Sequence, residues 1–220
     1  KGDRVMRVAV HPKLHQMGLG TVLIDGIYQR SVSDQVDYLG ASFGATSELL
    51  TFWTTIGFTP VRLGLQRDAS SGEHSVVVMK PISARAVALC DEAAGRFNHQ
   101  FYFDLSDGFS ELSTNLVLRL LNSSDEKDWL LNERDLAELT AFTTHKRVYE
   151  SCSLVVAKCV MLAVIQQRIK SSCNTQEIHV LIRRVIQKNK PQKVIAELNL
   201  NGKKQLDEIL RQATQKLHEY

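Results

Sequence analysis

The chain has 220 residues, of which 44% are hydrophobic and 23% charged, with a formal net charge of +3. This composition is that of an ordinary globular protein and excludes a disordered chain. No apolar run approaches the roughly 18 residues that a membrane span needs, and the first residues lack the apolar segment of a signal peptide, so we expect a cytoplasmic protein without membrane contact.

The amino-terminal part alternates between strand-like and helix-like patterns. Segments rich in β-branched and aromatic residues predict strands over 4–10, 38–43, 58–63 and 75–79. Apolar residues with helical spacing predict helices over about 22–33 and 47–55, the second opened by Thr46 or Ser47 followed by Glu48. This order predicts an α+β (α/β) fold, in which a sheet is flanked by helices.

After Pro81 the apolar period becomes helical throughout, which predicts an all-helical carboxy-terminal domain. We place the domain boundary near residue 82, giving domains over 1–82 and 83–220. The predicted helices cover 82–97, 108–121, 132–142, 145–169, 175–188 and 205–217. Residues 194–211 predict two helices around Asn201–Gly202, either as a helix-turn-helix or as a plain helical hairpin.

The four cysteines, Cys90, Cys152, Cys159 and Cys173, show neither CxxC spacing nor a histidine at metal-ligand spacing. This favours buried thiols over a disulfide framework, and no metal site is predicted.

Charge is distributed unevenly along the helical part. Between residues 168 and 204 there are nine lysines and arginines against two glutamates, whereas 104–138 carries an acidic excess. The basic residues either contact phosphates of a nucleic acid or form a solvated helix face. The candidates for RNA contact are Arg183, Arg184, Lys188, Lys203 and Lys204.

A glycine-containing turn, His15-x-x-Gly18-x-Gly20, lies between the first predicted strand and helix. Glycines permit a sharp turn and close approach of a ligand, and the N–H groups at a helix start attract an anion such as a pyrophosphate. The spacing matches neither a Walker loop nor a Rossmann fingerprint, because Leu23 stands at the third glycine position. A purely structural turn is the alternative.

The segment VAVHP-xx-HQMGLGTVLI, followed by FWTTIGF, resembles the acetyl-CoA-binding segments of the GNAT superfamily. The run from Asp37 to Trp53, together with 67–74 and 198–204, resembles the bacterial tRNA(Met) cytidine acetyltransferases more closely. This resemblance implies a partial GNAT sheet followed by a tRNA-binding helical domain. It implies cofactor contacts by Val8, Ala9 and Val10 along the pantetheine arm, and by His15, Gln16, Met17, Gly18, Leu19, Gly20 and Thr21 around the pyrophosphate. His15 departs from the Gln or Arg of the superfamily pattern, and Gln16 is a neighbouring substitute for it.

The resemblance implies transfer of an acetyl group from acetyl-CoA to the exocyclic amine of the wobble cytidine of elongator tRNA(Met), forming N4-acetylcytidine. Glu48 is expected either to contact acetyl-CoA or to stabilise the first turn of its helix. Trp53 stands where many GNAT enzymes have a tyrosine acid, and an indole cannot replace that acid. His11 and His74 are the remaining candidate proton carriers, and a structural role is the alternative for both.

The family also has further GNAT strands and an ATP-dependent helicase-like module, for which this sequence holds no Walker motif. We expect the chain to be a fragment that keeps the cofactor-binding residues without full turnover, with ATP bound only by the absent module. The sheet edge left by the missing strands is expected to be open to pairing with another copy. A GNAT enzyme acting on a protein or small-molecule amine and a non-catalytic RNA-binding module are the alternatives.

Overall fold

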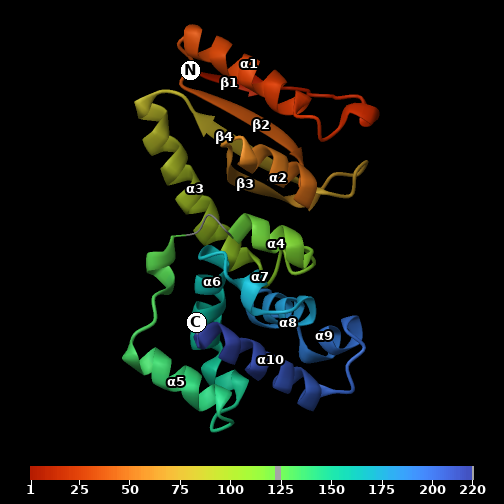
Figure 1. The fold of residues 1–220 in the computed structure, drawn as a ribbon, viewed down its shortest axis with the longest axis vertical. Coiled ribbons are helices and arrows are strands. Elements are labelled where there is room, and N and C mark those ends of the chain that lie inside the picture. Colours follow the sequence, from red (N-terminus) through yellow and green to blue (C-terminus); the bar gives the residue numbers. More distant parts are fainter. Residues whose placement is uncertain (122–124, 220) are drawn as a thin grey trace. The chain divides into compact units, whose positions relative to one another are not determined.

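The computed structural model describes residues 1–121 and 125–219, and the chain divides into two compact units, Lys1–Asn98 and His99–Tyr220 (Figure 1). The division lies inside the helix α3 (Ala84–Asp104), which begins directly after the sheet. The boundary that the composition change predicts near residue 82 therefore precedes α3 and stays a prediction.

The first unit is a four-stranded mixed sheet in the order β1-β2-β4-β3, with helices packed on it. β1 pairs parallel with β2, whereas β4 pairs antiparallel with both β2 and β3. The elements before α3 are β1 (Gly2–Val5), η1 (Pro12–Leu14), α1 (Leu19–Ser33), β2 (Tyr38–Gly44), α2 (Ser47–Thr55), β3 (Thr59–Arg67) and β4 (His74–Pro81). The predicted α/β sheet with flanking helices is confirmed.

The core of this unit follows the alternation of its strands. On β2, Leu39 and Ala41 are buried, and on the neighbouring β4 the buried residues are Val76 and Val78. α1 contacts β2, and α2 contacts β3. α2 begins where predicted, because the Thr46 hydroxyl accepts the backbone N–H of Leu49 and satisfies a donor that a helix start leaves free.

The first strand is shorter than predicted. β1 ends at Val5, whose partner is Ala41, so the predicted strand over 4–10 is wrong for residues 6–10. Residues 6–10 leave the sheet, and Met6 is 78% exposed. A segment rich in valine favours an extended backbone, but a strand also needs a hydrogen-bonded neighbour, and residues 6–10 separate from β2, which itself continues to Gly44.

The second unit is helical, as predicted. Besides the end of α3 it contains α4 (Thr114–Leu121), η2 (Glu126–Trp129), α5 (Glu133–Thr143), α6 (Tyr149–Ile165), α7 (Ile169–Ser172), α8 (Thr175–Val180), η3 (Leu181–Ile186, a π-helical turn), α9 (Pro191–Glu197) and α10 (Lys203–His218). The predicted helix over 145–169 breaks into α6 and α7, because Gln167 has a left-handed backbone with φ 57°.

α6 forms the centre of this unit and contacts α4, α5, α7, η2, η3 and α10. Cys152 and Cys159 on α6 are both buried, as expected for core thiols. The two helices predicted around Asn201–Gly202 are α9 and α10. Among the described residues, none of the helices combines the length and the apolar character that crossing a bilayer requires.

Candidate functional site

The first unit contains a groove of about 610 Å³ where β1 leaves the sheet. One wall is formed by the end of β1 and the segment after it, and the other by β2 and α2. The first turn of α1 closes one end. Of the predicted cofactor contacts, the groove is lined by Val8, Val10, His15, Gln16, Gly18, Leu19, Gly20 and Thr21.

The groove exists because β1 and β2 separate after Val5 and Ala41. On β2, Ser42 and Phe43 continue the pairing with β4, while the chain on the opposite side runs free toward η1. Met6 and Arg7 line the groove in that free segment. Because β1 ends at Val5, a hollow forms between β2 and the segment that follows β1.

The glycine turn lies at the start of α1. Gly18 is the N-cap residue, with a left-handed φ of 78°, and it leaves open space where a side chain would be. The helix begins its own bonding with the N–H of Val22, which donates to the Gly18 carbonyl at 3.1 Å. The earlier first-turn N–H groups have no helical acceptor, so this end can hold an anion.

Gly20 has a different role from Gly18. A Cβ added to Gly20 would lie 3.2 Å from the Phe52 ring. The glycine thus lets the first turn of α1 pack closely on α2, and this contact accounts for it without a ligand.

His15 is tied to its own segment. Its Nε2 lies 2.9 Å from the Val10 carbonyl oxygen, and since a carbonyl only accepts, this nitrogen must carry the proton. The bond closes the loop between β1 and α1. His11 is exposed, and its Nδ1 accepts the N–H of Lys13 at 3.3 Å.

Besides His11, four predicted site residues of the first unit do not line the groove. Ala9, Met17 and Glu48 are exposed and are not among the residues lining the groove, and Glu48 occupies the first turn of α2. His74 is buried on β4, with Nδ1 at 2.8 Å from the Gly64 carbonyl oxygen. His74 does not line the groove, so its role as a proton carrier stays a prediction without support from this geometry.

Sequence reasoning missed the aromatic side of the groove, formed by Phe43, Phe52 and Trp53. The rings of Phe43 and Trp53 are stacked with centroids 5.7 Å apart, and Phe52 meets Trp53 edge to face at 5.4 Å. We call these three residues the aromatic wall. The only sequence signal for the aromatic wall was the adjacent pair Phe52 and Trp53 in FWTTIGF. That pair alone did not predict that both side chains would line the groove.

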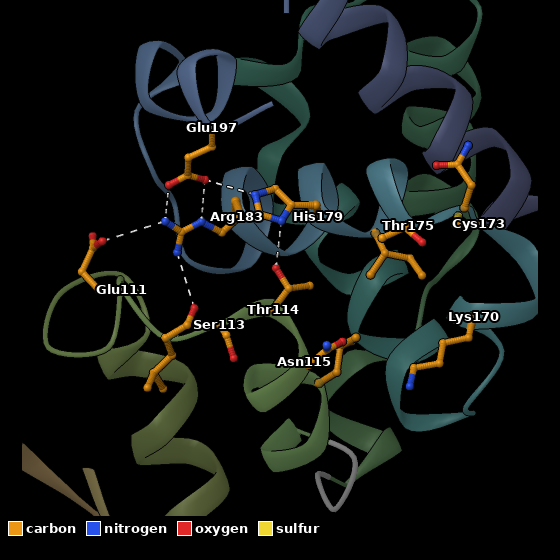
Figure 2. A pocket seen from close by; sticks show the side chains of 14 residues that line it. Glu111, Ser113, Thr114, Asn115, Lys170, Cys173, Thr175, His179, Arg183 and Glu197 are labelled. Atoms are coloured by element: carbon orange, nitrogen blue, oxygen red, sulfur yellow. Dashed lines mark hydrogen bonds and ion pairs between the residues drawn. The ribbon is translucent and has the colours of Figure 1, made fainter. Parts of the chain in front are cut away.

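The second unit contains a wider groove of about 800 Å³, lined by residues of α4, α7, α8, η3 and α9 and of the loop before α4 (Figure 2). Figure 2 shows Arg183 and Glu197 facing each other on one side, with His179 between Glu197 and Thr114. His179 Nε2 lies 3.1 Å from Glu197, and its Nδ1 lies 3.3 Å from the Thr114 hydroxyl.

Arg183 is an interior residue, with a side chain only 7% exposed. Its Nε donates to Glu197 at 2.9 Å, and its Nη1 donates to the Ser110 carbonyl at 2.7 Å and to Gln187 at 3.1 Å. The hydrogen bond from Arg183 lowers the pKa of Glu197 and raises that of Arg183 itself. The prediction that Arg183 contacts RNA stays a prediction, and its buried guanidinium is bonded within the protein.

The other predicted RNA contacts lie nearer the surface. Arg184 stacks over the Tyr149 ring at 4.7 Å and lies 3.9 Å from Glu150, to which Lys203 also donates at 3.1 Å. Lys188 and Lys204 are exposed and have no ion-pair partner in the part of the chain that the structure describes.

Comparison with known proteins assigns a family to each part of the chain. The model of the family GNAT acetyltransferase 2 matches residues 23–83, and that of the tRNA-binding domain family matches 87–219. The first match begins at Leu23, so the glycine turn lies outside it.

Curated relatives match nearly the whole chain. A tRNA(Met) cytidine acetyltransferase TmcA of Nitrosococcus halophilus is 39% identical over 97% of this chain and 29% of its own length. Proteins of the same name from Thermofilum pendens and Thermococcus kodakarensis are 29% and 31% identical over 91% and 85% of this chain, and 25% and 24% of their own lengths. The chain thus spans less than a third of the length of these relatives.

Proposed function

This chain belongs to the family of tRNA(Met) cytidine acetyltransferases, and we propose from that premise that it binds acetyl-CoA in its first unit and tRNA in its second. The observation that carries the proposal is the groove beside β1, which ends at an uncapped helix start. The acetyl acceptor is proposed to be the exocyclic amine of the wobble cytidine of elongator tRNA(Met), with N4-acetylcytidine as the product.

The residues of the groove fit this cofactor. The Gly18 turn presents backbone N–H groups and open space to a pyrophosphate. Val8 and Val10, in the segment that follows β1, offer an apolar strip to a pantetheine arm. The aromatic wall lies opposite, so both sides of the groove exclude water from the thioester.

Acetyl-CoA, when bound, supplies the thioester carbonyl that the amine attacks. The cytidine amine is a poor nucleophile because its lone pair is delocalised into the ring. The contribution we assign to the groove is therefore positioning, by the first turn of α1 and the aromatic wall. Trp53 cannot donate a proton to a departing thiolate as a tyrosine would. His11 Nε2 has no hydrogen-bond partner among the described residues, and His11 stays a candidate proton carrier, although it does not line the groove.

For tRNA we propose phosphate contacts by Arg184, Lys188, Lys203 and Lys204 on the second unit. These residues position RNA without reading its sequence. ATP dependence, which the family resemblance implies, would reside in parts of the relatives outside this chain. A tRNA substrate would place the reaction in the cytoplasm.

The test is calorimetric titration of the chain with acetyl-CoA, using Gly18→Glu and the matched control Gly72→Glu. Both glycines have a positive φ, 78° and 71°, and both leave open space, so the backbone strain of substitution is similar. Only Gly18 borders the groove. We expect the Gly18→Glu side chain to fill the anion site with a negative charge and abolish binding, while Gly72→Glu binds like the wild type.

Loss of binding in both variants would mean that strain disrupts the unit, and equal binding in both would refute the pyrophosphate site. A wild-type chain that binds tRNA but not acetyl-CoA would favour a non-catalytic RNA-binding module. Acetyl-CoA binding without any tRNA affinity would favour a GNAT enzyme acting on a protein or small-molecule amine.

A further inference from the structure

The groove of the second unit has a charge pattern of its own. At one end two carboxylates, Glu111 and Glu197, meet two cations. Arg183 pairs with Glu197 and lies 4.0 Å from Glu111, which also contacts Lys193. Two negative and two positive charges cancel, so this end is neutral at physiological pH.

The opposite end is positive. Lys170 lines the groove from α7, and a smaller hollow of about 130 Å³ shares Leu118 and Lys170 with it and adds Arg119. Neither Lys170 nor Arg119 has an ion-pair partner among residues 1–121 and 125–219. Their charges are therefore available to a ligand, in contrast to that of Arg183.

Between the two ends the lining is neutral and polar over an apolar floor. Leu118 and Cys173 belong to the floor and are buried. Asn115 and Thr175 line the groove as exposed side chains with no hydrogen-bond partner in the described parts of the chain (Figure 2). An amide and a hydroxyl can both donate and accept, which suits the mixed edge of a nucleobase or a ribose hydroxyl.

His179 presents its ring to the same groove. Both ring nitrogens are engaged, one by Glu197 and one by Thr114, so the edge of the ring is committed within the protein. The side chain is still 30% exposed, and what it can offer a ligand is its flat face. Bases stack on such faces in single-stranded RNA recognition.

From these observations we infer that this groove binds one unpaired nucleotide of the tRNA, with its phosphate at Lys170 and Arg119 and its base beside Asn115, Thr175 and His179. The inference rests on the proposed tRNA binding and specifies where it occurs. The groove volume of about 800 Å³ lies within the range of small-ligand sites. A base paired inside a duplex is stacked on both faces and cannot enter a concave pocket, so an unpaired nucleotide is required.

The experiment measures affinity of the full chain for three probes: elongator tRNA(Met), a single-stranded oligocytidylate and a short fully paired RNA duplex. Asn115→Trp fills the groove, with Ser153→Trp, an exposed position on α6, as its matched control. Lys170→Glu reverses one of the two charges at the positive end, and Lys146→Glu, in the exposed turn between α5 and α6, makes the same charge change away from the groove. Circular dichroism and thermal melts establish that each variant is folded.

We expect Asn115→Trp to weaken tRNA and oligocytidylate binding by about 5- to 100-fold, the range for losing one stacked base. Duplex binding should stay unchanged, and so should all binding by Ser153→Trp. Lys170→Glu should also reduce the salt dependence of binding by about one ion, whereas Lys146→Glu leaves oligocytidylate binding intact.

If wild-type protein binds tRNA and Asn115→Trp binds it equally well, the groove is not the nucleotide site, although the proposed function stands. Equal loss for duplex and single strand would also overturn the inference, because it would indicate a surface phosphate contact. If the wild-type chain binds no tRNA, the proposed function itself fails.

Discussion

Replacing Arg183 by methionine should destabilise the second unit while leaving its surface charge almost unchanged. The guanidinium joins η3 to Glu197 of α9 and to the loop before α4 through the carbonyl of Ser110. Methionine retains much of the side-chain volume but donates no hydrogen bond. Among the described residues, the variant therefore leaves Glu197 with only His179 as a partner and the Ser110 carbonyl with only the Asn189 amide as a donor.

The cost follows from burial. Breaking a buried ion pair from one side costs about 3–5 kcal/mol of unfolding free energy. The Glu197 side chain is 26% exposed, so water can replace part of the lost interaction. We therefore expect about 3 kcal/mol, which corresponds to a melting temperature lower by roughly 10 °C for a unit of this size. Urea unfolding followed by circular dichroism measures it directly.

Arg184→Met is the control, because it removes the same charge from the next residue. It loses the contact over the Tyr149 ring, worth about 1 kcal/mol at a partly exposed site. If Arg183 were instead an RNA ligand, Arg183→Met would weaken tRNA binding at unchanged stability. A loss of stability below about 1 kcal/mol would refute the reasoning.

Three further predictions concern glycines, acid and thiols. Gly26→Ala should raise the unfolding free energy of the first unit by about 0.5–1 kcal/mol, because the added Cβ meets no atom within 4 Å. Gly20→Ala should lower that free energy, because its Cβ would press on the ring of Phe52 in the aromatic wall. Thermal melts of the two variants measure both effects. The Arg183 hydrogen bond lowers the pKa of Glu197 in the folded protein from its usual 4.5. The ionised Glu197 side chain therefore stabilises the fold fully above pH 4.5, and this stabilisation is lost as the pH falls through the lowered pKa. In Glu197→Gln the unfolding free energy should depend less on pH in that range. Burial raises the pKa of Cys159 and of Cys173 to about 11. Iodoacetamide at pH 8 should therefore label both thiols only after the protein unfolds. Rapid labelling of the folded protein, detected by mass spectrometry, would contradict this prediction.

The sequence predicted those features that depend on interactions between residues close together in the chain. The start of α2 is set by Thr46, whose hydroxyl bonds a backbone N–H three residues away, and the sequence located it within one residue. The turn at Gly18 was found for the same reason. Its left-handed backbone needs glycine, and the helix that follows begins at the next residue.

Features that depend on distant partners were missed. The end of β1 at Val5 depends on where the chain separates from β2, which itself continues to Gly44, and no pattern within residues 4–10 shows that point. Arg183 appeared to belong to a basic run, but its partners Glu197 and Ser110 lie 14 and 73 residues away in sequence. A count of charges along the chain cannot separate a buried guanidinium from an exposed one.

Whether a cation is buried or exposed decides whether it can attract RNA to the second unit. Glu150 lies near both Arg184 and Lys203, so one carboxylate is shared between two cations and a positive charge remains. Lys188 and Lys204 are exposed and form no ion pair with any residue that the structure describes. Counterion release upon RNA binding scales with the number of phosphates neutralised, and only exposed cations take part. The salt dependence of tRNA affinity should therefore fall when an exposed lysine is removed and stay constant in Arg183→Met, which separates the cations that bind RNA from the one that holds the fold.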